Sequence, residues 1–409
     1  MNLLSDVRDH IEQARDVSGR ATDVPWASFA EFLRSRVYDP QLATRHALTF
    51  CDDDRALRRT YTYAELGAIV ERLAGVFHTR FGLTRGDRAA TLLFNHDVTV
   101  LTYLAAWTLG VAVVPINIEE TPDKKRYILE HSEVSTVFCW QDGYEELCAL
   151  QSDIPTLRQV IALGDGGVLD SHRSGKKSLP NGSVRSLRRS PFTSGLDDHA
   201  LIVYTSGTTG PPKGVILTVA NLLIDADAIA SWHSFGLHDR LMCVLPIHHV
   251  NGIVVTLITP LYCKGSVVMN RRFKTTSFWR RIHEEQVTSV SVVPTLLEFL
   301  LDADEDLTPY DLSRLGGLIC GAGPLLKDTA ARFEHRFGVV IRHGYGLSET
   351  TCYSCFLPND LTQEQHRHWL TGSEFPSVGV PVRHNLMTVL DERGRTLPPA
   401  TRGEICIRG

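Results

Sequence analysis

The 409-residue sequence lacks long apolar runs, an excess of positive charge and a set of paired cysteines. A membrane-spanning helix needs about 20 successive apolar residues, and no run approaches that length, so we expect no membrane span. Asp6, Asp9, Glu12 and Asp16 interrupt the apolar residues of positions 1–24, which is not the pattern of a secretory signal. These absences favour a cytoplasmic protein.

The charge balance argues against a protein dedicated to binding nucleic acid, which would usually be basic. Lys and Arg number 42 and Asp and Glu number 47, giving a net charge of −5. Charged residues make up 22% and hydrophobic residues 43% of the chain, as in ordinary globular proteins rather than disordered ones.

Nine cysteines are scattered through mostly apolar segments. The one close pair, Cys352 and Cys355, lacks the second pair or the nearby histidines that a zinc site requires. His366 and His368 are likewise isolated. We therefore expect reduced, buried thiols and no structural metal.

Apolar strand-like segments alternate with helix-like segments along most of the chain. Strands are predicted at 46–50, 88–93, 110–115, 135–140 and 200–204, and helices at 64–77, 98–109 and 122–131. Such alternation predicts parallel sheets covered by helices on both faces.

Two changes of composition divide the chain into three parts. Residues 163–198 are polar and rich in turn residues, which is typical of a solvated connection rather than of a nucleic-acid or membrane surface. We expect a first α/β subdomain over 1–195, including this insert, and a second over 196–375. Short antiparallel strands are predicted over 376–409.

A loop rich in glycine and hydroxyl groups follows the strand at 200–204. Glycines let the backbone turn its N–H groups toward an anion, and Lys213 adds a positive charge, so a polyphosphate is the expected ligand. Pro212 and Gly214 flank the lysine, which rules out the P-loop of kinases. A plain turn exposed to water remains the alternative on composition alone. The loop residues expected to bind are Thr205, Ser206, Gly207, Thr208, Thr209, Gly210 and Lys213.

The ten residues Thr205–Gly214 resemble the phosphate loop of the adenylate-forming superfamily. This superfamily includes acyl-CoA synthetases, firefly luciferase and the adenylation domains of nonribosomal peptide synthetases. Further motifs follow in the family's order, from about Thr60 to Gly409. The resemblance implies the family's large N-terminal domain: two doubly wound α/β subdomains with helices on both sheet faces, and a small β-barrel-like subdomain. The barrel segments would include Val378–Pro381 and Gly403–Ile405.

The resemblance also assigns the acyl and adenine pockets. His249 would line the acyl pocket, where a neutral imidazole can donate to a carboxylate or phosphate oxygen. The other residues implied for the acid are Val250, Asn251, Gly252, Gly321 and Gly344. The backbone implied against the adenine is that of Gly321, Ala322, Gly323 and Pro324.

A further motif, Gly344–Thr351, resembles the family's Y-G-x-T/S-E element. It implies that Gly344, Tyr345 and Gly346 contact the nucleotide, with Tyr345 stacked on the adenine. The Ser348 hydroxyl would reach the α-phosphate and Glu349 would bind Mg²⁺; a surface carboxylate is the alternative for Glu349. The implied catalytic set is Lys213, His249, Ser348 and Glu349. Such groups would neutralise the charge that builds up when a carboxylate attacks ATP.

The resemblance stops short of the family's full pattern. Members continue with an S/T/Y-G-D element and a C-terminal domain of roughly 100 residues that supplies a lysine, and no lysine follows Lys327 here. We therefore expect a large N-terminal domain without its C-terminal partner, which binds nucleotide or acyl-adenylate with little activity. An enzyme specialised to one half-reaction is the alternative.

The expected reaction is activation of a carboxylic acid by ATP and Mg²⁺, with transfer to CoA or to a carrier-protein phosphopantetheine. Residues 231–237 contain no Asp to pair with an amino acid, and Asp239 is expected to be a turn acid. Residues 251–269 resemble a pocket-lining helix, in which Asn251 and Thr256 either face the acid or pack the helix. A non-catalytic nucleotide-binding module is the competing class.

Overall fold

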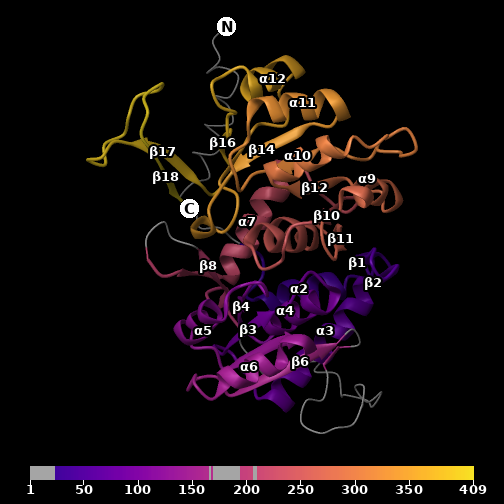
Figure 1. Cartoon of the computed structure of the whole chain (residues 1–409), viewed down its shortest axis with the longest axis vertical. Helices are drawn as coiled ribbons and strands as arrows, with labels where there is room; N and C mark the ends of the chain where they lie inside the picture. The colour runs from indigo at the N-terminus through magenta and orange to yellow at the C-terminus, as the bar shows by residue number, and fades with distance from the viewer. Residues whose placement is uncertain (1–23, 165–166, 169–193, 206–209) are drawn as a thin grey trace.

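The computed structural model describes residues 24–164, 167–168, 194–205 and 210–409. These form a seven-stranded sheet, a nine-stranded sheet and a separate two-stranded sheet. Figure 1 shows the seven-stranded sheet in the lower half of the molecule and most of the nine-stranded sheet above it. Most of the predicted insert and four residues of the predicted phosphate loop lie outside the described residues.

The seven-stranded sheet has the order β7-β6-β5-β3-β4-β8-β9, and its inner strands are parallel. Its edge strands β7 and β9 pair antiparallel with their neighbours. Its strands are β3 (Arg88–Leu92), β4 (Ala112–Pro115), β5 (Thr136–Trp140), β6 (Gln159–Gly164), β7 (Gly167–Val168), β8 (His199–Thr205) and β9 (Lys213–Thr218).

The nine-stranded sheet has the order β16-β15-β14-β13-β12-β10-β11-β1-β2 and is parallel from β14 to β1. Its strands are β1 (His46–Asp52), β2 (Leu57–Thr62), β10 (Arg240–Cys243), β11 (Ser266–Asn270), β12 (Ser289–Val292), β13 (Leu318–Cys320), β14 (Ile341–Tyr345), β15 (Cys355–Phe356) and β16 (Val380–Pro381).

Helices surround both sheets, which confirms the predicted α/β class. The longer ones are α2 (Phe29–Val37), α3 (Tyr63–Phe81), α4 (Asp97–Thr108), α5 (Pro122–His131), α6 (Tyr144–Gln151), α7 (Val219–Trp232), α9 (Thr275–Glu284), α10 (Pro294–Ala303), α11 (Lys327–Phe337) and α12 (Gln363–Thr371). Short helical turns are η1 (Gln141–Gly143), α8 (Thr259–Tyr262) and η3 (Ser348–Thr350).

The two sheets do not divide the chain at one position. Strands β1 and β2 belong to the larger sheet, although the chain then builds most of the smaller sheet before returning to it. Strands β8 and β9 complete the smaller sheet after residue 195. The division at 195/196 therefore stays a prediction about folding units and does not mark a boundary between sheets.

Helix α4 holds the two halves together. All twelve of its residues are buried, as expected of a helix that is apolar on every side. The indole of Trp107 donates to the carbonyl of Ala200 on β8 at 2.7 Å, and the hydroxyl of Tyr103 donates to the carbonyl of Ile247 at 3.0 Å. The same buried cluster includes residues of β1, α7 and the 251–258 segment.

Two predictions for the second half need correction. Residues 251–269 do not form one helix: η2 (Asn251–Ile258) is a π-helix, α8 follows it, and residues 266–270 are strand β11. Lys264 has a φ of +66°, a left-handed conformation that ends a helix. In the predicted barrel segment, β17 (Leu386–Leu390) and β18 (Glu404–Arg408) form the predicted antiparallel pair, and the described residues contain no closed barrel.

All nine cysteines are unpaired and six of them are buried. Among the described residues, no helix combines the length and the hydropathy that a membrane span requires. Within the same ranges, no three His, Cys, Asp or Glu side chains come together as a candidate metal site.

Candidate active site

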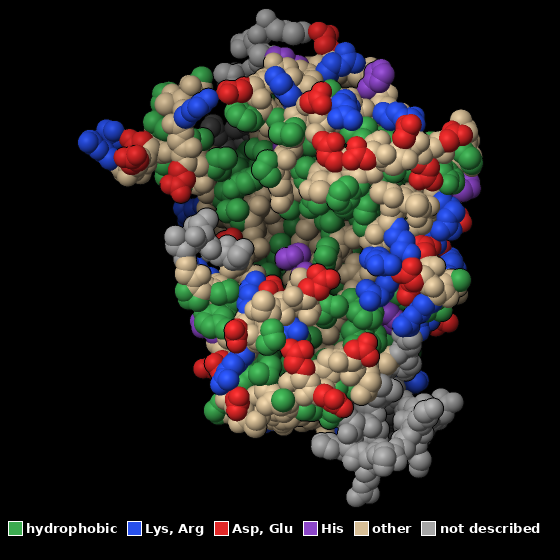
Figure 2. All heavy atoms as spheres, viewed as in Figure 1, with side chains coloured by type: hydrophobic (Ala, Val, Ile, Leu, Met, Phe, Trp, Pro, Cys, Tyr) green, Lys and Arg blue, Asp and Glu red, His purple; other side chains and the backbone are tan. Residues whose placement is uncertain are grey.

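The predicted motifs meet at the carboxyl ends of the parallel strands. Strand β8 of the smaller sheet ends at Thr205, while β13 and β14 of the larger sheet end at Cys320 and Tyr345. Open α/β sheets bind their ligands at this edge. Figure 2 shows that this face is hollowed between the upper and lower halves of the molecule.

The phosphate loop connects β8 to β9, so its two ends are held together as a hairpin. Thr205 pairs directly with Lys213, and Gly210 has a φ of +102°, which glycine adopts without strain. The hydroxyl of Tyr127 on α5 donates to the Pro212 carbonyl at 3.1 Å. Ser206, Gly207, Thr208 and Thr209 lie outside the described residues.

The glycines of two other motifs are required by packing. A Cβ on Gly346 would collide with the carbonyl of Cys352, and one on Gly344 would collide with the Phe356 ring. A Cβ on Gly321 would lie 2.6 Å from the hydroxyl of Tyr353. Only glycine allows the ends of β13 and β14 to approach the 352–356 segment this closely.

Two non-glycine residues near these glycines have left-handed backbones. Ala322 has a φ of +60° and Thr351 a φ of +73°. Such conformations cost on the order of 1 kcal/mol each and concentrate at ligand sites. Ala322 lies two residues after the end of β13, and Thr351 directly follows η3, the turn beyond β14.

In the β14 motif, Tyr345 and Glu349 have no side-chain partner among the described residues. Turn η3 is closed by Thr350, whose hydroxyl oxygen accepts from the Leu347 N–H at 3.1 Å. Glu349 on this turn is exposed, and no described residue forms an ion pair with it. Tyr345 is half-buried, and no described residue hydrogen-bonds its hydroxyl or stacks on its ring.

Lys213 and Glu349 come from neighbouring elements, because β9 lies against η3. The Lys213 side chain is exposed, and among the described residues it has no ion pair or hydrogen bond. An unpaired cation and an unpaired carboxylate on adjacent elements suit a ligand that carries phosphate and a divalent cation.

Residues 244–250, which we call the histidine loop, follow β10. The rings of His248 and His249 lie 4.4 Å apart. Burial, with a smaller contribution from the charge of His249, lowers the pKa of His248 to about 3. Desolvation by the surrounding protein lowers the pKa of His249, and the charge of nearby Glu120 opposes that shift. The His248 imidazole is therefore neutral at pH 7 and can donate or accept a hydrogen bond.

Asn251 and Thr256 are occupied by packing contacts. The Asn251 amide nitrogen donates to the Tyr353 hydroxyl at 3.3 Å, and its oxygen accepts from Ser291 at 2.6 Å. The Thr256 hydroxyl donates to the Gly252 carbonyl at 2.9 Å. Of the two interpretations, these contacts favour the packing one. Val250 and Gly252 are buried beside them.

Asp239 fills the turn role that its sequence position predicts. Its carboxylate accepts from the N–H of Gly236 at 2.8 Å, and β10 begins at the next residue.

One feature that no sequence motif indicated is the buried acid Asp225 on α7. It is 6% exposed, one of its side-chain oxygens has no partner, and no cation of the described residues forms an ion pair with it. Burial raises its pKa well above the ordinary value, although the Tyr353 N–H opposes this. No local pattern distinguishes such an acid from a surface acid of a helix.

A family model described as AMP-binding enzyme matches residues 41–409. The chain belongs to the AMP-binding enzyme family. Among curated proteins it is similar to a sulfoacetate–CoA ligase of Cupriavidus necator, with 31% identity over 89% of this chain and 65% of that protein. A feruloyl-CoA synthase of Amycolatopsis is 28% identical over 92% of this chain and 68% of that one. The chain thus spans about two thirds of the length of these relatives.

Solved structures of the family share the fold. ATP-bound MatB from Rhodopseudomonas palustris matches with a TM-score of 0.78 at 26% identity, over 93% of this chain and 70% of that one. The N-terminal domain of FACL13 from Mycobacterium tuberculosis matches with a TM-score of 0.75 at 25% identity, over 94% of this chain and 89% of that one. The predicted adenylate-forming fold is therefore confirmed.

Proposed function

We propose that this protein activates a carboxylic acid with ATP as an acyl-adenylate and then passes the acyl group to CoA. The observation that carries the proposal is that Lys213 and Glu349, on adjacent elements at the carboxyl edge of the sheets, have no partner among the described residues. The family match and the CoA ligases among the relatives support it.

The side chains at the edge suit the charge changes of adenylation. The substrate carboxylate attacks the α-phosphate of ATP and pyrophosphate leaves, so two anions must approach each other. Lys213 and the N–H groups of the phosphate loop would neutralise the phosphates, and the Ser348 hydroxyl would hold the α-phosphate. Tyr345 has a free ring face for the adenine, and His249 would orient the carboxylate.

The donor set also fits Mg²⁺. This ion keeps several waters and is usually held by one or two carboxylates together with substrate phosphates. Glu349 supplies one exposed carboxylate that no described residue contacts as an ion pair, and the phosphate loop starts from the neighbouring hairpin. When bound, Mg²⁺ would offset the negative charge of the triphosphate.

The acid itself stays open between several classes. The relatives act, by their names, on acids as different as sulfoacetate and ferulate. Here the polar ends of Asn251 and Thr256 are engaged within the protein. This favours a plain carboxylic acid whose chain contacts apolar groups, without deciding its length.

An acid-dependent exchange of pyrophosphate into ATP tests the proposal. The assay uses residues 1–409 with a panel of short, aromatic and sulfonated carboxylic acids, and CoA thioesters are then sought by mass spectrometry. Exchange that depends on one acid supports adenylation, and a carrier-protein phosphopantetheine tested beside CoA identifies the acceptor. Absence of both exchange and enzyme-bound adenylate would contradict the proposal.

The prediction that residues 1–409 have little activity stays a prediction, and the same assay tests it. Exchange well below the range typical of enzymes, about 1 s⁻¹ or more, is the expected result. Turnover at ordinary enzyme rates would contradict this part and leave the adenylation proposal standing. Nucleotide binding without any exchange would favour the non-catalytic module.

A further inference from the structure

The peptide of Ile247, two residues before His249, is bonded on both sides by buried side chains. These side chains belong to the half of the molecule that contains the seven-stranded sheet. Asn95 accepts from the Ile247 N–H at 2.9 Å through its amide oxygen. Tyr103 donates to the Ile247 carbonyl at 3.0 Å. Asn95 is 5% exposed and Tyr103 is 1% exposed, so water does not replace either bond.

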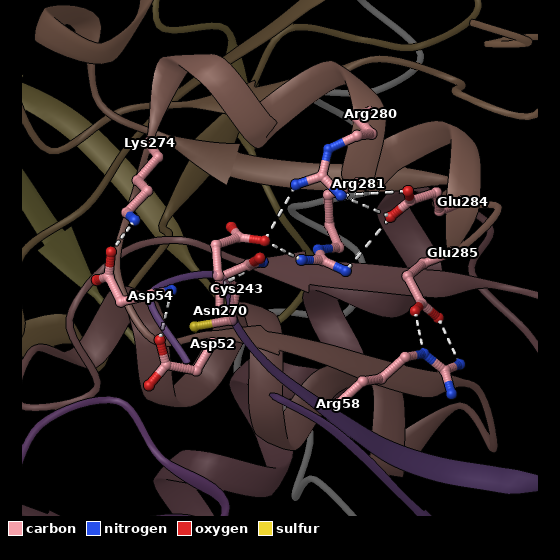
Figure 3. A network of polar contacts seen from close by, with 11 residues as sticks. Asp52, Asp54, Arg58, Cys243, Asn270, Lys274, Arg280, Arg281, Glu284 and Glu285 are labelled. Atoms are coloured by element: carbon pink, nitrogen blue, oxygen red, sulfur yellow. Dashed lines mark hydrogen bonds and ion pairs between the residues drawn. The ribbon is translucent and has the colours of Figure 1, made fainter. Parts of the chain in front are cut away.

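The amide of Asn95 makes two further bonds at the strand ends. Its nitrogen donates to the carbonyl of Leu245 at 2.9 Å and to that of Asn270 at 3.2 Å. Asn270 in turn donates to the carbonyl of Cys243 at 3.3 Å, and Figure 3 shows these two residues side by side. One side chain therefore joins the ends of β10 and β11 to the histidine loop.

These bonds are needed because the loop has left the sheet. The last pair between β10 and β11 joins Cys243 to Met269, so the peptide of Ile247 has no strand partner. A buried backbone N–H or C=O without a partner costs about 1 to 3 kcal/mol. Asn95 and Tyr103 supply partners that the sheet no longer provides.

We propose that Asn95 and Tyr103 are positioning residues that fix the place of His249 relative to the bound phosphate. The inference rests on the proposed function, because His249 must face the acyl phosphate for its place to matter. Asn95 follows β3 and Tyr103 lies on α4, the helix whose Trp107 is bonded to β8. The half of the molecule that carries the phosphate loop thereby sets the position of the histidine.

The chain offers a matched control for Tyr103. Tyr63 is also a fully buried tyrosine, and its hydroxyl donates to a backbone carbonyl, that of Gly265, at 2.6 Å. Tyr63→Phe therefore removes the same kind of bond from the same kind of environment. It leaves the histidine loop bonded to Asn95 and Tyr103.

The test compares two ligands that differ in the group His249 would contact. Isothermal titration measures AMP and 5′-O-(N-acetylsulfamoyl)adenosine, a stable acyl-adenylate mimic with the smallest acyl group. Tyr103→Phe is expected to weaken the mimic about fivefold to tenfold, the loss of roughly one hydrogen bond, with AMP affinity unchanged. Asn95→Leu is expected to show the same selectivity with a larger loss, and Tyr63→Phe is expected to change neither affinity.

Three results would overturn the inference while the wild type still binds both ligands. These are equal losses for both ligands in Tyr103→Phe, no loss for either, or the same selective loss in Tyr63→Phe. A wild-type chain that binds neither ligand would instead contradict the proposed function, and this inference with it. If Asn95→Leu does not fold, the comparison of ligand affinities between Tyr103→Phe and Tyr63→Phe is sufficient to test the inference.

Discussion

Along the carboxyl edge of the nine-stranded sheet, the charged side chains compared below are paired at one end and unpaired, among the described residues, at the other. At the β11–β1 end the charges are paired: Asp53 contacts Arg281 at 2.6 Å, Glu284 contacts Arg280 at 3.2 Å, and Asp54 contacts Lys274 (Figure 3). At the β13–β14 end, Glu349 and the neighbouring Lys213 have no charged partner among the described residues.

The difference separates a structural use of charge from a binding use. A paired carboxylate has its charge offset and its lone pairs occupied, so it has little to offer a ligand. The Glu349 carboxylate, on the turn that follows β14 and two residues from the strained Thr351, keeps its charge and its lone pairs available. Substitutions at the two ends should therefore affect different properties, binding at one end and stability at the other.

The largest effect is expected for Glu349→Gln. We expect the rate of acid-dependent pyrophosphate exchange to fall roughly 100-fold, because the amide keeps the shape but removes the charge that would hold Mg²⁺. The affinity for the acetylsulfamoyl mimic should change less than about twofold, since the mimic carries no triphosphate. Equal losses in exchange and in mimic binding would remove the distinction between the two ends.

Glu285→Ala should lower stability and leave nucleotide binding unchanged. The Glu285 carboxylate is buried and contacts Arg58 at 2.6 Å and also Arg240. Removing it leaves Arg240 buried without its partner, which costs about 2 kcal/mol once the exposure of Arg58 is allowed for. Chemical denaturation measures the loss, and ATP titration serves as the control.

The pKa of Glu285 adds a pH dependence to this prediction. Burial raises the pKa, but the hydrogen bond from Arg58 and the charge of Arg240 outweigh it, so the folded pKa lies below the ordinary value. The stabilisation is present above the unfolded pKa, near 4.5, and is lost as the pH falls through the folded pKa. The difference in unfolding free energy between wild type and Glu285→Ala should shrink below about pH 4. A difference that stays constant there would contradict this prediction.

Asp225→Asn should raise stability at neutral pH, although Asp225 lies near the binding end. Its raised folded pKa means that the wild type loses stability as the pH rises from about 4 toward that pKa. The amide has no proton to lose, so we expect a gain on the order of 1 kcal/mol at pH 8 and none at pH 4. Urea denaturation at both values measures it, and a loss at pH 8 would show that the carboxylate is charged and bound.

Lys213→Ala should weaken ATP only about tenfold, less than a full loss of the site. The N–H groups of the phosphate loop are expected to carry much of the contact with the triphosphate. Isothermal titration with ATP measures the change. Complete loss of ATP binding would show that the lysine dominates the loop.

The smallest effect is expected for Asp54→Asn. Asp54 pairs with Lys274 and, at 2.8 Å, with Arg272, but both of its ion pairs are exposed to solvent. Exposed pairs contribute little, so neither the thermal midpoint nor ATP affinity should change measurably. A fall in ATP affinity would place a binding role at the end of the sheet that we assign to structure.

The sequence predicted most helices and strands, because their signals are local. Helix α5 occupies the predicted 122–131, since Thr121 caps it and Pro122 is suited to the first turn. The predicted helix through 251–269 was wrong at β11, because a short apolar run such as Val267–Met269 fits a buried strand as well as a buried helix. The pairing of β1 with β11 joins residues more than 200 positions apart, which no local pattern reports.

The site was predictable in its motifs and not in its supports. The resemblance grouped Tyr345, Ser348 and Glu349 in one motif, and the structure brings β9 beside η3, which carries Ser348 and Glu349. No local sequence pattern marks Asn95 as a residue that supports the site, because its partners Leu245 and Ile247 lie 150 and 152 positions away. The burial of Asp225 depends likewise on tertiary packing.

The most direct test of the unpaired charges is a titration of ATP with and without Mg²⁺. Wild type and Glu349→Gln are compared, each with excess Mg²⁺ and with EDTA. We predict one ATP per chain, bound more tightly with Mg²⁺ in the wild type and equally in both conditions in Glu349→Gln. Absence of ATP binding in the wild type, or the same Mg²⁺ dependence in both proteins, would contradict the account.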